Sequence, residues 1–518
     1  MGDWMTGLAD HYAGCRRAHP GDDLVIVFDI DGTILDMRHM MCHVLVGFDR
    51  ERGTDLFAGL RAEDIDVHEN QVERFLERRG LSSTQRDEVL QWYLAQRWAP
   101  ASVLAAHRPY RGVLEVIRWF QIQPSTRVAL NTGRPERLRD ETLRCLNALG
   151  REYRVTFPDA LLHMNPDDWE VDVGTHKVEG LDRLRDDGYR IVAVVDNEPE
   201  IIEAMASADE SEEILFLHAE TLYESRRAPT PRTIGGTSYD LCSLVTERDL
   251  PGHVQLVWHG VNDQANLRQF LASPVRWGEV DVRRDGRDRL VLRHDSFDTL
   301  PPAPGERPLS LAGTLSELLA AGKGVKLDLK DGGALADVLA LLVRHGVGDA
   351  DLWFNGRLDV LGEEGVQAIA AAHPGATIQC PIDFLAPLVA AMPDEARRLL
   401  ATMAGWGVNR FSVGWGQPQT PELLDRLDEW GYDVNLYAVS DLEQFLRAAL
   451  LLPRSITADF NFPEWHYYGR GAGRNGHYHR YRLDGVATPV TDGPQADGPQ
   501  ADGATDRGVA SHPQRVAP

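Results

Sequence analysis

Short apolar runs alternate with amphipathic stretches through the first 220 residues of the chain. Uninterrupted apolar runs are typical of strands buried on both faces, and apolar residues three and four apart indicate helices. The predicted strands are 24–28, the start of 127–136, 189–200 and 213–219, and helical spacing covers 38–107 and 176–188. Strands that alternate with helices predict a parallel, doubly wound α/β sheet, whose ligands bind at the carboxyl ends of the strands.

A second alternating series begins at residues 253–260. Its further strand candidates are 277–283, 289–295, 324–330, 350–355, 376–381, 410–416, 433–439 and 455–461. Helical stretches such as 334–346 and 420–431 separate several of these strands. The series therefore predicts a (β/α)8 barrel of the TIM type.

The two series divide the chain into two domains, 22–224 and 251–470, and the first carries a helical insert at 37–107. Residues 225–250 contain many Pro, Gly, Ser and Thr residues, which predicts a linker. Residues 471–518 are rich in Gly and repeat GPQAD. Their apolar content is too low for a core, so we expect a disordered tail.

The charge balance limits the classes of partner. The chain has 54 Lys and Arg against 79 Asp and Glu, a formal charge of −25. This excludes a protein that coats nucleic acid or binds membranes through a polybasic surface. It leaves small phosphate esters as substrates, because a bound cation reverses the local field.

The cysteines and the apolar runs bear on location. The five cysteines are scattered, and none has the spacing of a zinc site. Reduced thiols predict a cytoplasmic protein. The N-terminus lacks the apolar region of a secretory signal, and no apolar run is long enough for a transmembrane helix. The sequence leaves the oligomeric state open.

Lysine is scarce in this chain. The four lysines are Lys177, Lys323, Lys326 and Lys330, so 50 of the 54 basic residues are Arg. One reading is a coding bias that replaces surface Lys with Arg. Another is that the lysines that remain lie where a compact ammonium is needed and a planar guanidinium does not fit. We expect some of the four to be functional.

Two carboxylates follow the first predicted strand. In FDIDGTILD, Asp29 ends the apolar run and Asp31 lies two residues further, in a turn that contains glycine. One carboxylate at a strand tip can bind Mg²⁺ and attack phosphorus, and the other can transfer the proton of the leaving group. Acidic residues after a strand are also common in solvated loops.

The complete pattern of residues 22–220 resembles the haloacid dehalogenase (HAD) phosphohydrolases, whose first motif is DxDGT. Thr132 in LNTGR matches the second motif, Lys177 in THKVEGL the third, and Asp196 in VVDNEPE the fourth. Glu200 has the spacing of the second acid of that motif, and Asn197 or Glu198 are alternatives.

The resemblance implies a role for each residue. Asp29 would be the nucleophile that forms an aspartyl-phosphate, Asp31 the general acid and base, and Thr132 and Lys177 would hold the phosphoryl group. Asp29, Asp31, Asp196 and Glu200 would hold Mg²⁺. The helical insert would be a cap that excludes water and selects the substrate.

The second domain carries charged residues at every second position of two predicted strands. Glu279 and Asp281 lie in WGEVDVR, and Lys326, Asp328 and Lys330 lie in GVKLDLK. A period of two places such side chains on one strand face, here the inside of the barrel. Buried charges are costly unless they are paired or bound to metal, and three carboxylates suit Mg²⁺ or Ca²⁺.

Two histidines follow predicted strands of the same domain. His259 closes 253–260, and His294 closes 289–295, which the pattern predicts as the third barrel strand. They could act as general base and general acid on a phosphodiester. Asn355 and Trp415 also lie at strand ends, where each is a candidate for substrate binding or for simple packing.

Residues 253–466 resemble the PLC-like phosphodiesterase barrels, which include glycerophosphodiester phosphodiesterases and sphingomyelinase-D-like enzymes. The WHGVN start at 258–262 and the KLDxK strand are similar to the menorin branch. The usual HRG opening is replaced by His259-Gly260-Val261, and Asp328 stands where many relatives have Glu.

The predicted function is that of a bifunctional hydrolase of phosphate esters. The first domain would cleave phosphomonoesters with Mg²⁺, and the barrel would cleave a glycerophosphodiester-like substrate with Mg²⁺ or Ca²⁺. One alternative is a phosphatase fused to a non-catalytic, ligand-binding barrel. Another is a HAD domain that acts as a phosphotransferase or a regulatory module.

Overall fold

The structure is a computed structural model. It describes residues 4–166, 172–220, 233–245, 254–273, 275–302, 306–416, 420–440, 442–458, 468–470 and 478–480. The predicted tail, 471–518, lies outside the described residues except for β17 (Tyr478–Arg480), which pairs antiparallel with β16 (Tyr468–Arg470).

The N-terminal half is built on a parallel sheet of six strands in the order β3-β2-β1-β4-β5-β6. The strands are β1 (Asp23–Phe28), β2 (Thr126–Pro135), β3 (Leu162–Asn165), β4 (Tyr189–Asp196), β5 (Leu215–Ala219) and β6 (Thr233–Gly236). Residues 24–28 of β1 are all buried, as expected for the centre of a sheet covered on both faces. The prediction of a parallel α/β sheet is therefore confirmed.

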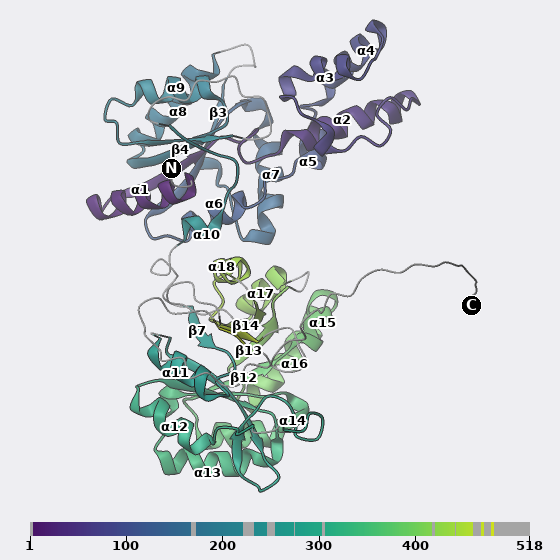
Figure 1. The fold of residues 1–518 in the computed structure, drawn as a ribbon. Helices are drawn as coiled ribbons and strands as arrows, with labels where there is room; N and C mark the ends of the chain where they lie inside the picture. Colours follow the sequence, from purple (N-terminus) through teal and green to yellow (C-terminus); the bar gives the residue numbers. More distant parts are fainter. Residues whose placement is uncertain are drawn as a thin grey trace, which may run out of the picture. The chain divides into compact units, whose positions relative to one another are not determined.

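Helices cover both faces of this sheet (Figure 1). On one face α8 (Val173–Asp186) packs against α9 (Pro199–Ala208). On the other face lie α1 (Trp4–Ala18) and α6 (Val113–Gln121), which both contact the short α10 (Leu241–Leu244). Helix α7 (Arg139–Gly150) follows β2.

Part of the segment expected to be a linker belongs to the sheet. Residues 233–236 form β6, which pairs in parallel with β5. The prediction is wrong here because TIGG has too few apolar side chains to stand out as a strand. Small residues are needed at this place, since a Cβ on Gly236 would lie 2.3 Å from the Trp4 ring. The short β3, which pairs with β2, also escaped prediction.

The insert between β1 and β2 is helical, as predicted. It contains α2 (Met37–Arg52), α3 (Val72–Arg78), α4 (Ser83–Gln96) and α5 (Pro100–Ala106). Asp36 caps α2 by accepting from the Arg38 N–H, and Ser82 and Gln85 form a capping box at the start of α4. Among the described helices, none is both long enough and apolar enough to cross a bilayer.

The C-terminal half contains a closed barrel of eight parallel strands. The strands are β7 (Gln255–Trp258), β8 (Trp277–Arg284), β10 (Gly324–Leu329), β11 (Leu352–Asn355), β12 (Thr377–Pro381), β13 (Arg410–Gly414), β14 (Asp433–Val439) and β15 (Ser455–Ala458). The barrel closes because β7 pairs with both β15 and β8, while β8 also pairs with β10. The predicted TIM-type barrel is confirmed.

Helices follow most of these strands. They are α11 (Gln264–Ala272), α12 (Leu311–Ala320), α13 (Leu335–His345), α14 (Leu358–Ala372), α15 (Ala386–Ala391), α16 (Pro393–Trp406), α17 (Thr420–Glu429) and α18 (Leu442–Leu450). Helices thus surround the outside of the barrel. The charged side chains of β8 and β10 lie inside it, next to one another.

One predicted barrel strand is not part of the closed barrel. Strand β9 (Leu290–Leu292) pairs antiparallel with β8 through a hairpin connection at 285–289. The prediction of a third parallel strand at 289–295 is wrong because so short a connection can join only antiparallel strands. His294 is therefore carried by the end of this hairpin.

Candidate active sites

Neighbouring strands bring the first cluster together at one edge of the N-terminal sheet. Asp29 follows β1, and its N–H donates to the Val195 carbonyl oxygen of β4 at 2.9 Å. Asp196 ends β4, so the two carboxylates lie side by side. Lys177 of α8 donates from Nζ to Asp29 Oδ1 and to Asp196 Oδ2, both at 2.6 Å. All three side chains are buried.

The charges of this cluster do not balance. Burial raises the pKa of Asp29 to about 7; Lys177 opposes this rise and Asp196 adds to it. Burial works against the Lys177 ammonium, but Asp196 and Asp29 outweigh it and raise the lysine pKa. Two buried carboxylates thus share one ammonium. The surplus negative charge fits a divalent cation, which would favour the ionised form of Asp29.

The turn after β1 carries Asp31. Gly32 has a φ of 79°, and a Cβ there would lie 2.4 Å from the Asn197 side chain, so the turn needs glycine. Arg134, two residues after Thr132, makes two hydrogen bonds to the Asp31 carboxylate. The buried Thr132 Oγ1 accepts a hydrogen bond from the Arg134 N–H at 3.2 Å. Sequence reasoning missed this arginine, although it lies within LNTGR.

Of the three residues that the sequence offers as a further cation ligand, Asn197 is buried, Glu198 is half-buried and Glu200 is exposed. Glu200 is exposed in the first turn of α9. The Glu198 N–H donates to Asp196 Oδ1 at 2.9 Å, and Asn197 accepts from Thr33 Oγ1 at 3.3 Å. Glu200 stays a prediction as a cation ligand, and its exposed side chain in the first turn of α9 favours the alternatives Asn197 and Glu198.

The helical insert also reaches this cluster. His68 Nε2 lies 2.8 Å from Glu198 Oε1 and 3.3 Å from Glu69 Oε2. Glu69 is buried, and burial raises the pKa of its carboxyl group. His68 was missed because its segment of short helical turns has no recognisable motif.

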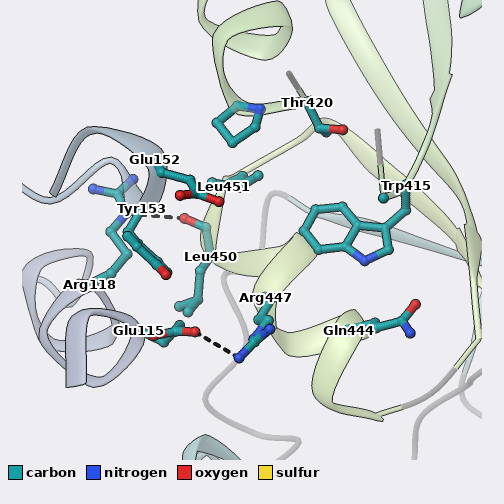
Figure 2. Close-up of a pocket in the computed structure, with 12 residues that line it drawn as sticks. Glu115, Arg118, Glu152, Tyr153, Trp415, Thr420, Gln444, Arg447, Leu450 and Leu451 are labelled. Carbon is teal, nitrogen blue, oxygen red and sulfur yellow. Dashed lines mark hydrogen bonds and ion pairs between the residues drawn. The ribbon is translucent and has the colours of Figure 1, made fainter. Parts of the chain in front are cut away.

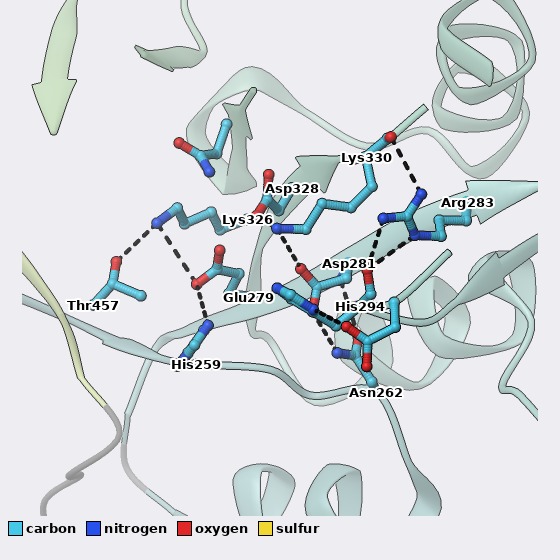
Figure 3. A network of polar contacts seen from close by, with 12 residues as sticks. His259, Asn262, Glu279, Asp281, Arg283, His294, Lys326, Asp328, Lys330 and Thr457 are labelled. Atoms are coloured by element: carbon cyan, nitrogen blue, oxygen red, sulfur yellow. Dashed lines mark hydrogen bonds and ion pairs between the residues drawn. The ribbon is translucent and has the colours of Figure 1, made fainter. Parts of the chain in front are cut away.

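The second cluster follows from the register of two parallel barrel strands. Glu279 on β8 is the register partner of Lys326 on β10, and Asp281 is the partner of Asp328. All four are buried. Ligand oxygens of Glu279, Asp281 and Asp328 lie within 4.8 Å of one another (Figure 3). The structure thus brings together the three carboxylates that the sequence predicts as a metal site.

The donor set of this cluster suits a hard divalent cation. Three carboxylates face two ammonium groups: Lys330 Nζ lies 3.1 Å from Asp281 Oδ1, and Lys326 Nζ lies 3.7 Å from Glu279 Oε2. Those two buried carboxylate oxygens receive no hydrogen bond from the described residues. Oxygen ligands with free lone pairs and a surplus negative charge fit Mg²⁺ or Ca²⁺.

The two aspartates of the cluster have opposite pKa shifts. Burial tends to raise the pKa of Asp281, but Lys330, His294 and His259 outweigh it and lower the pKa to about 2. Burial raises the pKa of Asp328 to about 6, although Lys330 opposes this. Asp281 is therefore ionised at any physiological pH, whereas Asp328 exchanges its proton near pH 6.

Both predicted histidines lie beside the carboxylates. His259 Nε2 is 4.0 Å from Glu279 Oε2. His294 Nδ1 is 2.8 Å from Asp295 Oδ1, and the His294 carbonyl oxygen accepts from Arg283 Nε and Nη2 at 3.0 and 2.8 Å. Arg283 and Asp295 thus orient His294, and the sequence reasoning missed both.

Asn262 and Thr457 also support the cluster. Asn262 Nδ2 donates to Asp281 Oδ2 at 2.5 Å, and its Oδ1 accepts from the Asp281 N–H at 2.9 Å. Thr457 of β15 accepts from Lys326 Nζ at 2.8 Å. Asn262 is the last residue of the WHGVN start, so a signal for it was present in the sequence. Thr457 is brought close only by closure of the barrel.

The two weaker candidates have different surroundings. Asn355 of β11 is the register partner of Asp328 and accepts from Gln379 Nε2 at 2.7 Å, so it lies next to the cluster. Trp415 lines a pocket with Thr420, Gln444 and Arg447 (Figure 2). None of the three carboxylates is among the described residues that line that pocket. Trp415 is therefore not placed with them.

Comparison with known proteins gives fold likenesses only. No protein-family model matches the chain, and no curated protein matches it. A phosphodiesterase from Oleispira antarctica, solved with the product sn-glycerol-3-phosphate, is 17% identical, with a TM-score of 0.32. The likeness covers 40% of this chain and 93% of that one.

Two further solved structures are similar to parts of the chain. A glycerophosphodiester phosphodiesterase from Agrobacterium tumefaciens is 18% identical over 40% of this chain and 95% of its own, with a TM-score of 0.31. A protein from Bacteroides vulgatus, provisionally named a beta-phosphoglucomutase, is 16% identical over 41% of this chain and 82% of its own, with a TM-score of 0.24. At these identities the likenesses concern the fold and leave the chemistry to the residues described above.

Proposed function

We propose that the barrel hydrolyses a small phosphodiester, with a glycerophosphodiester-like compound as the substrate class. The observation that carries this proposal is the group of three buried carboxylates with His259 and His294 beside it. Carboxylates alone would suit a structural cation. Two histidines next to them supply groups that can transfer protons near neutral pH.

The barrel residues divide the reaction between them. Glu279, Asp281 and Asp328 would hold the divalent cation, which when bound offsets the negative charge of the phosphate oxygens. His259 accepts a proton from the attacking water molecule while the water oxygen bonds to phosphorus. His294 gives a proton to the leaving oxygen as its bond to phosphorus breaks. Lys326 and Lys330 add positive charge along one side of the cluster.

Hydrolysis of bis-p-nitrophenyl phosphate tests this proposal. The wild-type protein should release p-nitrophenol when Mg²⁺ or Ca²⁺ is present and stop when the cation is chelated. His259→Ala should lower the rate on the order of 10²-fold or more. Asp29→Asn serves as the matched control, because it alters only the N-terminal cluster. It should leave the initial rate of diester cleavage unchanged, as measured before the product p-nitrophenyl phosphate accumulates.

A barrel that binds its ligand without turnover is the second candidate. Gly260 has a φ of 69°, a conformation that favours glycine and disfavours the arginine of the HRG opening. The chain therefore lacks the arginine of that opening, which favours binding without turnover. A wild-type protein that binds a glycerophosphodiester in calorimetry but never cleaves it, with any divalent cation, would support this candidate.

For the N-terminal half, we propose hydrolysis of a phosphomonoester through an aspartyl-phosphate on Asp29. The contact of Lys177 with both Asp29 and Asp196 supports this proposal. Asp29 and Asp196, with Asn197 or Glu198, would hold Mg²⁺, which when bound neutralises charge on the phosphoryl group.

In the proposed reaction, Asp29 carries the phosphoryl group and Asp31 gives and takes the proton. An Asp29 oxygen bonds to phosphorus while the bond to the leaving oxygen breaks, and Asp31 gives that oxygen its proton. Water then attacks phosphorus and loses a proton to Asp31, which releases phosphate and restores Asp29. Thr132 and Lys177 hold the phosphoryl oxygens during both steps.

A panel of phosphomonoesters with Mg²⁺ tests the N-terminal proposal. Free phosphate should appear with the wild-type protein and be absent with Asp29→Asn, whereas His259→Ala should release it normally. Phosphate that appears only on a second substrate would instead identify a phosphotransferase. No phosphate in either form, with any member of the panel, would contradict the proposal and favour a regulatory module.

We also propose that the two activities act in sequence. The phosphomonoester product of the barrel would be the substrate of the N-terminal site. Asp29→Asn should then accumulate a phosphomonoester from a glycerophosphodiester, visible by ³¹P NMR, while the wild-type protein yields free phosphate. A wild-type protein that never consumes the phosphomonoester would show that the two domains are merely tethered.

A further inference from the structure

Arg134 has an unusually complete set of contacts. Its side chain has no exposed surface, although it carries a permanent charge. Nε donates to Asp31 Oδ2 at 2.7 Å, and Nη2 donates to Asp31 Oδ1 at 2.6 Å. The remaining terminal nitrogen, Nη1, donates to Thr142 Oγ1 of α7 at 3.1 Å. Both oxygens of the Asp31 carboxylate are therefore held by one planar fork.

The helical insert contributes an aromatic ring that packs on the face of the guanidinium group. Trp98 lies between α4 and α5, and the centroid of its ring is 5.1 Å from Arg134 Cζ. Trp98 is itself 9% exposed. A cation over an indole ring is attracted by the negative face of the ring, most strongly where water is excluded. The insert thus touches the arginine that holds Asp31.

We infer that Arg134 is a positioning residue that orients Asp31 for proton transfer, and that Trp98 couples the helical insert to it. A planar guanidinium with two parallel bonds fixes the rotation of a carboxylate, which a rotating ammonium cannot do. Thr142 and Trp98 in turn fix the guanidinium. This inference rests on the proposed phosphomonoesterase, in which Asp31 protonates the leaving oxygen.

If Arg134 orients Asp31, the fall in kcat caused by replacing Arg134 should depend on the leaving group of the substrate. An alkyl phosphate such as glycerol phosphate needs a proton on its leaving oxygen, whereas p-nitrophenyl phosphate expels p-nitrophenolate, a stable anion that leaves without a proton. A misoriented Asp31 should therefore slow the alkyl ester far more than the aryl ester. A residue that only stabilised the fold would slow both by the same factor.

The test compares Arg134→Lys and Arg134→Met with the wild-type full chain on both esters with Mg²⁺. Both variants should lower kcat for glycerol phosphate on the order of 10²-fold and for p-nitrophenyl phosphate less than tenfold, with KM little changed. Arg139→Met is the matched control, because Arg139 makes a similar two-bond pair with Glu136. It should leave both rates unchanged.

Two further variants keep the test decisive if the Arg134 variants fold poorly. Trp98→Leu should lower kcat for glycerol phosphate selectively, but by a smaller factor than the Arg134 variants do. Trp98→Phe, which keeps an aromatic ring, should retain much of the wild-type kcat. In an Asp31→Asn background, Arg134→Lys should lower kcat no further. Equal losses on both esters, or a full further loss without Asp31, would overturn the inference while leaving the phosphomonoesterase intact. A wild-type protein inactive on every phosphomonoester would overturn both.

Discussion

Asp281 and Asp328 are register partners on the parallel strands β8 and β10, and Lys330 Nζ contacts both carboxylates. The lysine lies 3.1 Å from Asp281 Oδ1 and 2.5 Å from Asp328 Oδ2. Glu279 lies two residues before Asp281 on the same strand, opposite Lys326. The register of two strands therefore builds the acidic cluster without help from a loop.

The first prediction concerns cation binding by this cluster. Asp281→Asn should abolish Ca²⁺ and Mg²⁺ binding at the barrel, because it removes a charged oxygen that is ionised at all working pH values. Asn262→Ala should weaken binding by about 10- to 100-fold, since Asn262 only orients Asp281. Isothermal titration calorimetry in an Asp29→Asn background measures this site alone. Asp337→Asn, an exposed acid on α13, is the control and should bind as the parent does.

A second prediction concerns Lys326. Its ammonium is buried, and burial lowers its pKa, yet Glu279 lies only 3.7 Å away. Lys326→Met should tighten cation binding about threefold or more, because a nearby positive charge disappears. Turnover of bis-p-nitrophenyl phosphate should fall, because the phosphate loses a cationic partner. Weaker cation binding in calorimetry would contradict the repulsion expected between the Lys326 ammonium and the cation.

The third prediction concerns the stability of the N-terminal cluster. Lys177→Met leaves Asp29 and Asp196 buried without their ammonium, which should cost about 3–5 kcal/mol of unfolding free energy. Mg²⁺ should restore part of this loss, because it fits between the same carboxylates. Thermal unfolding with and without Mg²⁺ measures both effects.

Lys323→Met is a useful control for this experiment. Lys323 Nζ donates only to the carbonyl oxygens of Ser273 and Val275 among the described contacts. Its loss should also destabilise the protein, but Mg²⁺ should restore nothing beyond its effect on the parent. An equal Mg²⁺ response in the two variants would argue against a cation between Asp29 and Asp196.

The fourth prediction concerns the pH dependence of stability. His107 is buried beside Cys145, and burial, with help from Arg134, lowers its pKa to about 3. The unfolded chain binds a proton at this histidine below its ordinary value near 6.5, whereas the folded protein does not. This histidine therefore takes nothing from the free energy of unfolding well above about pH 6.5. The free energy of unfolding falls as the pH drops through about 6.5 toward about 3.

Comparison with His107→Gln isolates this contribution. Between about pH 6.5 and about pH 5 the wild-type protein should lose about 1.6 kcal/mol more unfolding free energy than the variant. Half of the unfolded chains already carry this proton at about pH 6.5, and each further pH unit below that approaches about 1.4 kcal/mol. Chemical denaturation at several pH values in this range measures the difference. Parallel curves for the two proteins would show that His107 is not held neutral.

The lysines show how far residue composition can lead. Lys177, Lys326 and Lys330 each lie beside buried carboxylates, as their scarcity suggested. Lys323 differs, because its ammonium binds backbone carbonyl oxygens. A count of residue types cannot separate these cases, since both need a compact cation in a buried place.

The pattern of apolar and charged residues is enough to predict both folds and most of the clustered acids. Apolar runs ending in Asp29 and Asp196 predict strand tips, and alternation in GVKLDLK predicts one charged face, because strand geometry has a period of two. The antiparallel direction of the strand before His294 could have been predicted from its short connection to β8. Two contacts, of Arg134 with Asp31 and of His68 with Glu198, become visible in the folded chain alone. They join residues far apart in the chain, and local patterns carry no information about such pairs.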